Sequence, residues 1–321
     1  MKLTKIANDF APRNKALYFG ITTELEEPCD IEVEVVDADF DSTIARQLLR
    51  EITSVKVNIA PYTKPFTEYV PSLHPETSIE EAPTASYTIR VEGIEAEPIR
   101  LSVNSQEQMA PSLVSTMPLK RTIAYGERDE LLLIAHTNDN LAIVIKSDTG
   151  EELSLHHTTS TGAAILSLST EDFDNDIRSL YVEISCNEHS VSLLHYNVVS
   201  AHKSDVRLAW ISSRGSIERY TFPVTANRQR KAEKQTIRTR DGVGVVSSST
   251  ERRQTLVSRF EPRDTIDALA DIISATRVWI EEKGGFREVE VCSSVIDGNL
   301  FSEPDCVAIE LIDGHREEVV L

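Results

Sequence analysis

The stretch that decides the fold spans residues 206–224 and reads VRLAWISSRGSIERYTFPV. Leu208 and Trp210 stand two positions apart before the polar SSRG tetrad, and Tyr220 and Phe222 stand two positions apart after it. A period of two on both sides of a Gly-containing turn is typical of two antiparallel strands that share one apolar face. The stretch therefore predicts a half-buried β-hairpin anchored by aromatic side chains.

The composition of the whole chain favours the same class of structure. A length of 321 residues exceeds one ordinary core and predicts two or three domains. Hydrophobic residues make up 40% of the chain but aromatic residues only 6%, which favours thin β-layers over a large helical core. We predict a mainly β fold: two antiparallel β-sandwich domains, at 1–110 and 111–203, followed by a smaller α+β C-terminal domain at 204–321.

The first segment contains four strand candidates, at residues 16–23, 31–37, 54–60 and 86–92. Ile44, Leu48 and Ile52 follow a helical spacing, so residues 43–52 are predicted to form a short helix across the sheet. Residues 62–85 carry four prolines and predict an extended loop. A loop of this length is unusual in a compact domain, and in an assembly protein it could wrap a neighbour.

The second segment has a denser strand rhythm. Its strand candidates are residues 130–136, 141–147, 153–159, 163–169, 178–186 and 190–199. Turn signals rich in Asn, Asp, Gly and Ser separate them at nearly regular intervals. Short strands about ten residues apart predict an antiparallel sandwich.

The third segment begins with the opening hairpin and continues through a basic stretch, in which Asp241 and Gly242 predict a turn between two strands. Asp264 is predicted to cap a helix that ends near Ala275, because apolar residues recur there at helical spacing. Strand candidates follow at residues 277–281, 286–294 and 306–312.

Charge is distributed unevenly along the chain. The net charge of −19 disfavours a role in binding nucleic acid for the chain as a whole. About 18 acidic residues face about 6 basic ones between positions 20 and 110, whereas about 14 basic residues face about 6 acidic ones between positions 203 and 263. Patches of opposite sign can steer head-to-tail contact between copies, although charge runs are often only solvated faces.

The basic stretch supplies the candidate interaction site. Its arginines and lysine are open to three interpretations: an inter-subunit contact, a nucleic-acid footprint, or a solvated hairpin. No aromatic residue is interleaved for base stacking, so an inter-subunit contact is favoured over nucleic acid. With the hairpin residues, the candidate interface residues are Trp210, Arg214, Arg228, Arg230, Lys231, Arg238 and Arg240.

No catalytic constellation, metal site or cofactor motif stands out. The acidic clusters that begin at Asp37 and Asp172 have the oxygen spacing of calcium loops but lack the Gly and Glu that complete them, so turn caps are the simpler interpretation. Neither a phosphate-binding loop nor a nucleophile elbow is present, and the four scattered cysteines indicate reduced thiols. We expect no enzyme activity, no cofactor, no membrane span and no secretory signal.

A family resemblance follows from the order of the motifs. The hairpin at 208–222, a long charged strand pair, a helix at 265–275, and the strands that contain Arg277-Val-Trp279 and Glu288-Val-Glu290 together resemble tail or virion structural proteins of tailed phages and prophages of gut anaerobic bacteria. In those proteins a Trp, a polar turn ending in Gly, and an aromatic-Thr-Phe run recur in the hairpin. Here Ile217 stands where a Trp is often found.

The resemblance implies a structural, non-enzymatic subunit that is made in the host cytoplasm and built into a virion ring or tail. Its expected partners are copies of itself and other virion proteins. The alternative is a cell-surface or carbohydrate-binding β-sandwich protein, which would need an export signal.

Overall fold

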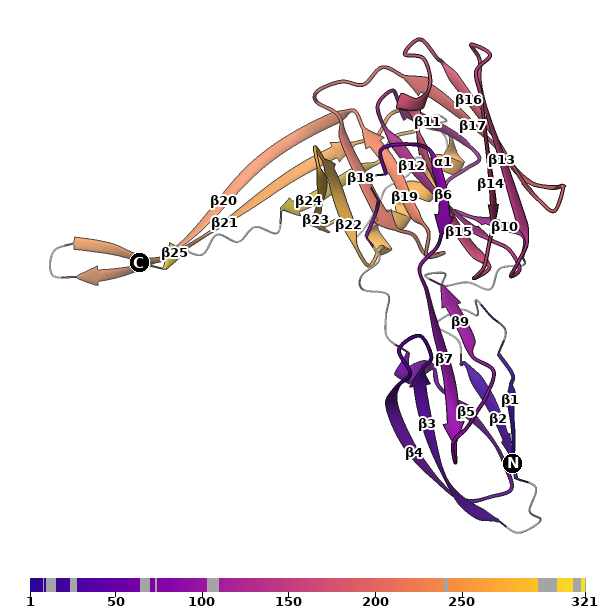
Figure 1. Ribbon diagram of the computed structural model, residues 1–321. Helices are drawn as coiled ribbons and strands as arrows, with labels where there is room; N and C mark the ends of the chain where they lie inside the picture. The colour runs from indigo at the N-terminus through magenta and orange to yellow at the C-terminus, as the bar shows by residue number, and fades with distance from the viewer. Residues whose placement is uncertain are drawn as a thin grey trace.

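The structure is a computed structural model, and it describes residues 1–7, 9, 16–23, 28–63, 70–72, 74–102, 110–239, 242–293, 305–313 and 319–320. The described chain is mainly β, with several antiparallel sheets, as the composition predicts. Figure 1 shows a first body that contains the N-terminus, a second body above it, and a third body from which a long two-stranded arm projects.

The first body packs two sheets against each other. One sheet has the order β1-β2-β5, and its strands are β1 (Lys2–Lys5), β2 (Tyr18–Thr22) and β5 (Ser54–Asn58), the last followed by the short 3-10 helix η1 (Ala60–Tyr62). The other has the order β4-β3-β7-β8 with β9 also on β7, and its strands are β3 (Cys29–Asp37), β4 (Ser42–Ile52), β7 (Thr84–Val91), β8 (Ile94–Glu95) and β9 (Ile99–Ser102). Phe19, Val33 and Ile89 lie between the sheets with no exposed surface.

The helix predicted at 43–52 is wrong, because these residues form strand β4. Strand β4 pairs antiparallel with β3, with Glu32 opposite Leu48 and a register shift next to Val35. It is the outer strand of its sheet, so both of its faces are partly open and Leu48 remains 57% exposed. A strand with two partly open faces does not require apolar and polar residues to alternate strictly. The four-residue spacing of Ile44, Leu48 and Ile52 is therefore compatible with a strand, although it matches the helical period.

The Pro-rich segment at 62–85 contains a strand in place of part of the predicted loop. Strand β6 (Ser78–Glu81) leaves the first body and pairs with the second body, where Glu81 lies opposite Ala164. The chain then returns to the first body as β7 (Figure 1). Residues 64–69 and 73 of this segment lie outside the described residues. The two bodies are therefore joined by a shared strand as well as by the chain that leads into β10.

The second body is a sandwich of two sheets, and the strands predicted for this segment are confirmed. The orders are β10-β12-β15-β6 and β11-β17-β16-β13-β14. The strands are β10 (Ser112–Val114), β11 (Lys120–Ala124), β12 (Arg128–Ile134), β13 (Asn140–Ser147), β14 (Glu152–Thr158), β15 (Ala163–Ser169), β16 (Ser179–Cys186) and β17 (His189–Val199), with the 3-10 helix η2 (Thr170–Asp172). All pairs are antiparallel except β11 with β17, which is parallel. Leu131, Ile143 and Leu166 belong to the shared core.

The third body is one curved sheet with a helix on its core side. Its strands are β18 (Val206–Ile211), β19 (Ile217–Phe222), β20 (Val224–Thr239), β21 (Gly242–Val257), β22 (Val278–Glu282), β23 (Gly285–Val291), β24 (Ala308–Asp313) and β25 (Val319–Val320). The order is β19-β18-β22-β23-β24-β21-β20, and β19 runs into β20 through Pro223, so the chain itself joins the two ends of this order. Trp210, Phe222 and Leu269 lie in the enclosed core.

The helix of this body is shorter than predicted. α1 (Arg263–Ala270) has Pro262 at its N-cap, so Asp264 lies in the first turn instead of capping the helix. The 3-10 helix η3 (Asp271–Ser274) continues the chain to the predicted end near Ala275. Ile266 and Leu269 face the core, which accounts for the helical spacing of the sequence.

The opening hairpin is confirmed as β18 and β19, but both faces of its strands are largely buried where half-burial was predicted, while the turn residues Ser213 and Arg214 are exposed. Every residue of β19 is buried. Ser212 donates its amide to the carbonyl oxygen of Ser216 at 2.8 Å, and Gly215 takes the positive φ of 83° that the turn requires. One face of the hairpin packs on the core of the third body, and the other packs on the second body through Ile165.

Candidate interaction surface

The arm formed by β20 and β21 is the most exposed regular element of the third body. Each strand has 16 residues, which corresponds to about 50 Å of extended chain. Strand β24 pairs with β21 only from Arg252 to Val257, and beyond that point β25 pairs with Ser247 and Ser248. Figure 1 shows the arm leaving the sheet and extending away from the three bodies. The turn predicted at Asp241 and Gly242 falls at its tip, but Arg240 and Asp241 lie outside the described residues.

One face of the arm carries basic residues without ion-pair partners. Arg228, Arg230 and Lys234 occupy alternate positions of β20, and Arg230 lies directly opposite Arg252 of β21. All four side chains are exposed, and none of them forms an ion pair within the described part of the chain. Like charges that face each other across two strands destabilise the pair, and on its other side Arg252 lies opposite Asp313 of β24 in the register.

The opposite face of the arm is neutralised. Lys231 lies opposite Glu251 in the register. Arg253, on the same face, donates to Glu251 and to Glu310 of β24, the latter at 3.3 Å. The register therefore separates Lys231 from Arg228 and Arg230, which the sequence had grouped together.

The remaining candidate interface residues lie in different environments. Trp210 has no exposed surface and belongs to the core of the third body, so the structure places it inside the fold and not on a docking surface. Arg214 is exposed at the hairpin turn, where its guanidinium donates to the carbonyl oxygen of Ser115 at 3.0 Å. Arg238 is exposed near the arm tip, and Arg240 lies outside the described residues.

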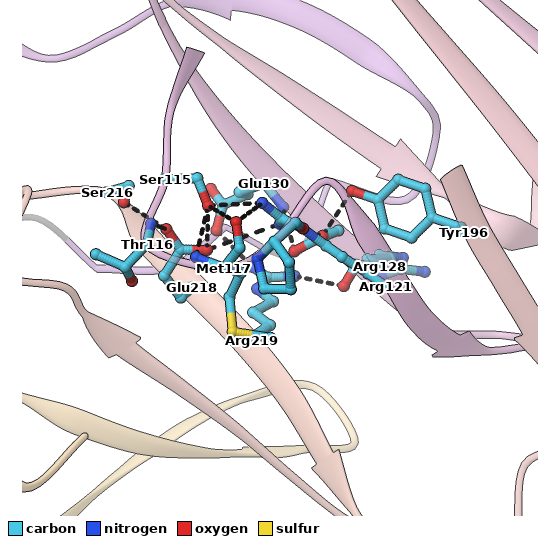
Figure 2. A network of polar contacts seen from close by, with 12 residues as sticks. Ser115, Thr116, Met117, Arg121, Arg128, Glu130, Tyr196, Ser216, Glu218 and Arg219 are labelled. Carbon is cyan, nitrogen blue, oxygen red and sulfur yellow. Dashed lines mark hydrogen bonds and ion pairs between the residues drawn. The ribbon is translucent and has the colours of Figure 1, made fainter. Parts of the chain in front are cut away.

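A second group of charged residues is buried where the second and third bodies meet (Figure 2). Arg219 of β19 pairs with Glu130 of β12, and the same guanidinium donates to the carbonyl oxygen of Ser72 at 2.7 Å. Arg219 is 4% exposed and Glu130 is 5% exposed. A charge pair without solvent needs an internal partner, and Arg219 and Glu130 provide it for each other across the boundary between the bodies, although Arg219 Nε has no hydrogen-bond partner among the described residues.

Glu218, next to Arg219, points to the opposite side of β19 and binds a different part of the second segment. It accepts hydrogen bonds from Ser115 Oγ at 2.9 Å, from the Thr116 amide at 2.9 Å and from Ser216 Oγ at 2.6 Å. The guanidinium of Arg121 lies 3.7 Å from the Glu218 carboxylate. Figure 2 shows these groups converging on the segment that enters β11.

Two further groups extend this buried network on either side. Arg121 also contacts Asp129 at 3.2 Å, and Asp129 accepts a hydrogen bond from the Tyr196 hydroxyl at 2.7 Å. Arg207 of β18 donates to Glu127 at 2.8 Å and lies 3.4 Å from Glu281. We call the whole set the buried junction, and its charged members are Arg121, Glu127, Asp129, Glu130, Arg207, Glu218, Arg219 and Glu281.

Burial shifts the titration of the carboxylates in the buried junction. Burial raises the pKa of Glu130, and the nearby Arg219 guanidinium opposes this only in part. Burial likewise raises the pKa of Glu218 against the opposing effect of Arg121. These groups have the perturbed titration of many functional sites, but their partners are fixed side chains of the same chain, which is the pattern of a structural join.

Strand β6 is held to the second body by a separate carboxylate. Glu81 accepts from the amide of Ser160 at 2.6 Å, from His157 Nε2 at 3.1 Å and from both the amide and the hydroxyl of Thr161. Burial raises the pKa of Glu81, but the hydrogen bonds from Thr161, Ser160 and His157 outweigh it and lower the pKa to about 2. The ionised carboxylate is therefore the form that fastens β6.

The other chemistry considered from the sequence has a plain outcome. Among the described residues, no group of three or more His, Cys, Asp or Glu side chains is placed to hold a metal ion. Asp172 accepts the Thr77 amide at 2.6 Å across 95 positions of sequence, so this contact joins two distant segments and is not the local turn cap that was expected. All four cysteines are unpaired thiols. Within the described ranges, no helix is both long and apolar enough to cross a membrane.

The buried junction was not predicted from the sequence, although the positions of its charged residues within the hairpin strands indicated it. Glu218 and Arg219 stand inside a strand whose other positions are apolar, Tyr or Thr, and Arg207 stands inside the partner strand. The alternation was interpreted as an apolar face and a solvent face. Charged residues of both signs on adjacent hairpin strands fit equally well a polar face covered by another domain.

Comparisons with known proteins identify no family. No family model matches the chain, and no curated protein matches it. Among solved structures, it is similar to a tetra-tandem repeat in the extending region of a large adhesion protein, at 13% identity over 80% of this chain and 70% of that one, with a TM-score of 0.22. It is also similar to a Dpr2 Ig1-Ig2 chain in complex with DIP-Theta Ig1-Ig3, at 10% identity over 63% of this chain and 96% of that one, with a TM-score of 0.18. At such TM-scores neither likeness carries an argument.

Proposed function

We propose that the protein is a structural subunit of a phage tail or connector, which acts through protein–protein contacts in a ring or tail complex. In this proposal it is made in the host cytoplasm and resides in the virion, with copies of itself and other virion proteins as partners. In this proposal its domains are two mainly antiparallel sandwiches, at 1–110 and 111–203, with strand β6 of the first segment added to a sheet of the second, and a smaller α+β domain at 204–321.

The observation that carries the proposal is the arm. A two-stranded ribbon is marginally stable on its own, and the outer part of this one has only the short strand β25 beside it in the described chain. Its free edge, strand β20, is 16 residues long and carries arginines and lysines that oppose pairing with another strand, so a partner would meet the face of the arm and not its edge. A partner that covers the arm would supply the packing and the charge compensation that it lacks.

The buried junction supports the same proposal from the other side. A subunit that transmits force through an assembly needs its bodies held in one arrangement, and charge pairs satisfied across the boundary oppose sliding. Strand β6 adds a second join between the first and second bodies. The protein thus combines joined bodies with one exposed arm.

The test is the mass of the protein in solution, measured by light scattering after size exclusion over a range of concentrations, alone and with the products of neighbouring genes. The informative variant removes residues 233–249 and joins Ala232 to Thr250, which lie opposite each other, through an Asn-Gly turn. We expect the full chain to form larger particles, and the shortened chain, which keeps Arg228, Arg230 and Arg252 but lacks the outer arm, to form them more weakly while keeping its melting temperature. A full chain that stays monomeric under all these conditions contradicts the proposal.

A further inference from the structure

The basic face of the arm restricts which surface can cover it. If two arms paired edge to edge through β20, they would bring Arg228, Arg230 and Lys234 of both copies together. Like charges across paired strands are destabilising, and lysines and arginines on an edge strand oppose this kind of pairing. A symmetric arm-to-arm dimer is therefore disfavoured, and the partner surface must be acidic.

The first body presents a matching acidic row. Along β3, Ile31, Val33 and Val35 point into the core, so Asp30, Glu32 and Glu34 occupy the outer face at alternate positions. Asp30 and Glu32 are exposed and form no ion pair within the described residues.

The two ends of this row differ. Glu34 is already compensated, because it lies 2.8 Å from Arg46 and 3.7 Å from Arg90. At the other end, Asp30 accepts a hydrogen bond from the Glu51 amide at 3.0 Å, and neither Asp30 nor Glu32 has a cation partner among the described residues.

The two rows have the same repeat. Alternate residues of a strand lie about 6.6 Å apart, both for the bases of β20 and for the acids of β3. Exposed Leu48 lies opposite Glu32 and offers apolar surface beside the acids, while Ala232 lies between Arg230 and Lys234 on the arm. In Figure 1 the arm extends away from the first body, so these two surfaces of one chain do not meet.

We propose that the basic face of the arm docks on the acidic outer face of β3 in a second copy of this chain, centred on Asp30 and Glu32. This inference rests on the proposed function and adds to it the partner surface and the kind of symmetry. The contact joins two different surfaces, so it is heterologous, and repeated contacts of this kind close into a ring or continue as a filament.

The test uses two variants of the chain with reversed charges. One variant alters the arm, and the other alters the outer face of β3. The arm variant carries Arg228→Glu and Arg230→Glu, and the sheet variant carries Asp30→Lys and Glu32→Lys. Each variant alone is expected to self-associate about 100-fold more weakly than the unmodified chain, because close charge pairs become repulsive. An equimolar mixture is expected to regain assembly with the two variants alternating, since the intact arm of the sheet variant meets the intact β3 of the arm variant, and the reversed arm meets the reversed β3.

Two further variants sharpen the result. A chain that carries all four reversals is expected to regain self-association, because the signs are exchanged and the pairs restored. Arg50 of β4 is exposed on the same edge of the first body and opposes a basic partner. Arg50→Glu is therefore expected to strengthen self-association about tenfold, with Lys231→Glu on the neutralised face of the arm as the matched control of small effect.

Several outcomes overturn the inference. A mixture that shows no complex, or a sheet variant that assembles like the unmodified chain, means that the arm meets another surface. Binding of the arm to duplex DNA, with loss of binding in the arm variant and no self-association, means that the basic row serves nucleic acid. If the chain does not self-associate but the arm variant loses binding to a neighbouring gene product, the second-copy contact is wrong while the proposed function stands.

Discussion

Arg219 and Arg230 lie eleven positions apart on one continuous run of chain, β19 followed by β20, and they are used in opposite ways. Arg219 is buried, paired with Glu130 and bonded to Ser72, whereas Arg230 is exposed, unpaired and opposite another arginine. Desolvated charges must be satisfied within the fold, while solvated charges can be left for a partner. The same run of chain therefore joins two bodies at one end and, in the proposed assembly, meets a partner at the other.

The largest loss of stability is expected at Trp210, in the apolar core of the third body on which the hairpin of the buried junction packs. Trp210→Ala should lower the free energy of unfolding by about 3 to 5 kcal/mol, because it empties a large aromatic side chain from the core of the third body. Chemical denaturation monitored by circular dichroism measures this. A loss of less than about 1 kcal/mol, the scale of surface substitutions, would show that the core arrangement is wrong.

The next largest effect is expected at Arg219. Arg219→Ala leaves the Glu130 carboxylate buried without its cation, which should cost about 3 kcal/mol. The matched change Arg230→Ala on the arm should cost less than about 0.5 kcal/mol, because that side chain is solvated. Equal losses at the two positions would remove the distinction between the junction and the arm. The double change Arg219→Met with Glu130→Leu should recover most of the stability, since two apolar side chains need no partner.

A smaller change in stability is expected when the pH is lowered, and it should arise at strand β6, which links the first body to the second. The pKa of Glu81 is lowered from 4.5 to about 2 in the folded chain, so its contribution to stability is present above about pH 4.5 and is lost as the pH falls toward 2. Burial raises the pKa of Glu130 and Glu218, so acid does not weaken the buried junction through these groups. Limited proteolysis at about pH 2 to 3, where the Glu81 carboxylate becomes protonated, should therefore cleave around β6 first, and Glu81→Gln should show the same cleavage at neutral pH. Acid cleavage that begins in β18 or β19 would contradict this order.

The smallest effect on folding is expected on the arm itself. Changing Arg228, Arg230 and Lys231 to Glu should leave the melting temperature within about 2 °C of the unmodified chain, because these side chains are exposed. The same change should weaken self-association, and the weakening should be smaller in high salt, where exposed charges are screened. Sedimentation velocity at low and high salt checks both points. An unchanged sedimentation profile would leave the arm without a role in assembly.

The sequence was informative wherever one face of a strand is buried and the other is solvated. Strands β13, β14 and β16 of the second body follow this rule, and six of the eight strands from β10 to β17 were predicted from alternation and turn residues. Strand β4 was mistaken for a helix because an edge strand with two open faces loses its alternation, as exposed Leu48 illustrates. Strand β6 was hidden in a Pro-rich segment because its pairing partner, β15, lies more than eighty residues away.

The candidate site was predictable only in part. The basic composition of the arm could be read from the chain, but the separation of Lys231 from Arg230 depends on the strand register. The buried junction could not be located, because a charged residue at an alternate strand position has the same pattern whether water or another domain covers it. Trp210 shows the converse, since an aromatic residue beside a polar turn suits a core as well as an interface.

Hydrogen–deuterium exchange at low and high protein concentration tests the contrast between junction and arm most directly. The amides of β18 and β19 should exchange slowly at both concentrations, whereas the amides of β20 from Arg228 to Lys234 should exchange quickly in dilute protein and become protected as copies associate. An arm that exchanges quickly at every concentration, or one that is already protected in the dilute monomer, would contradict the account.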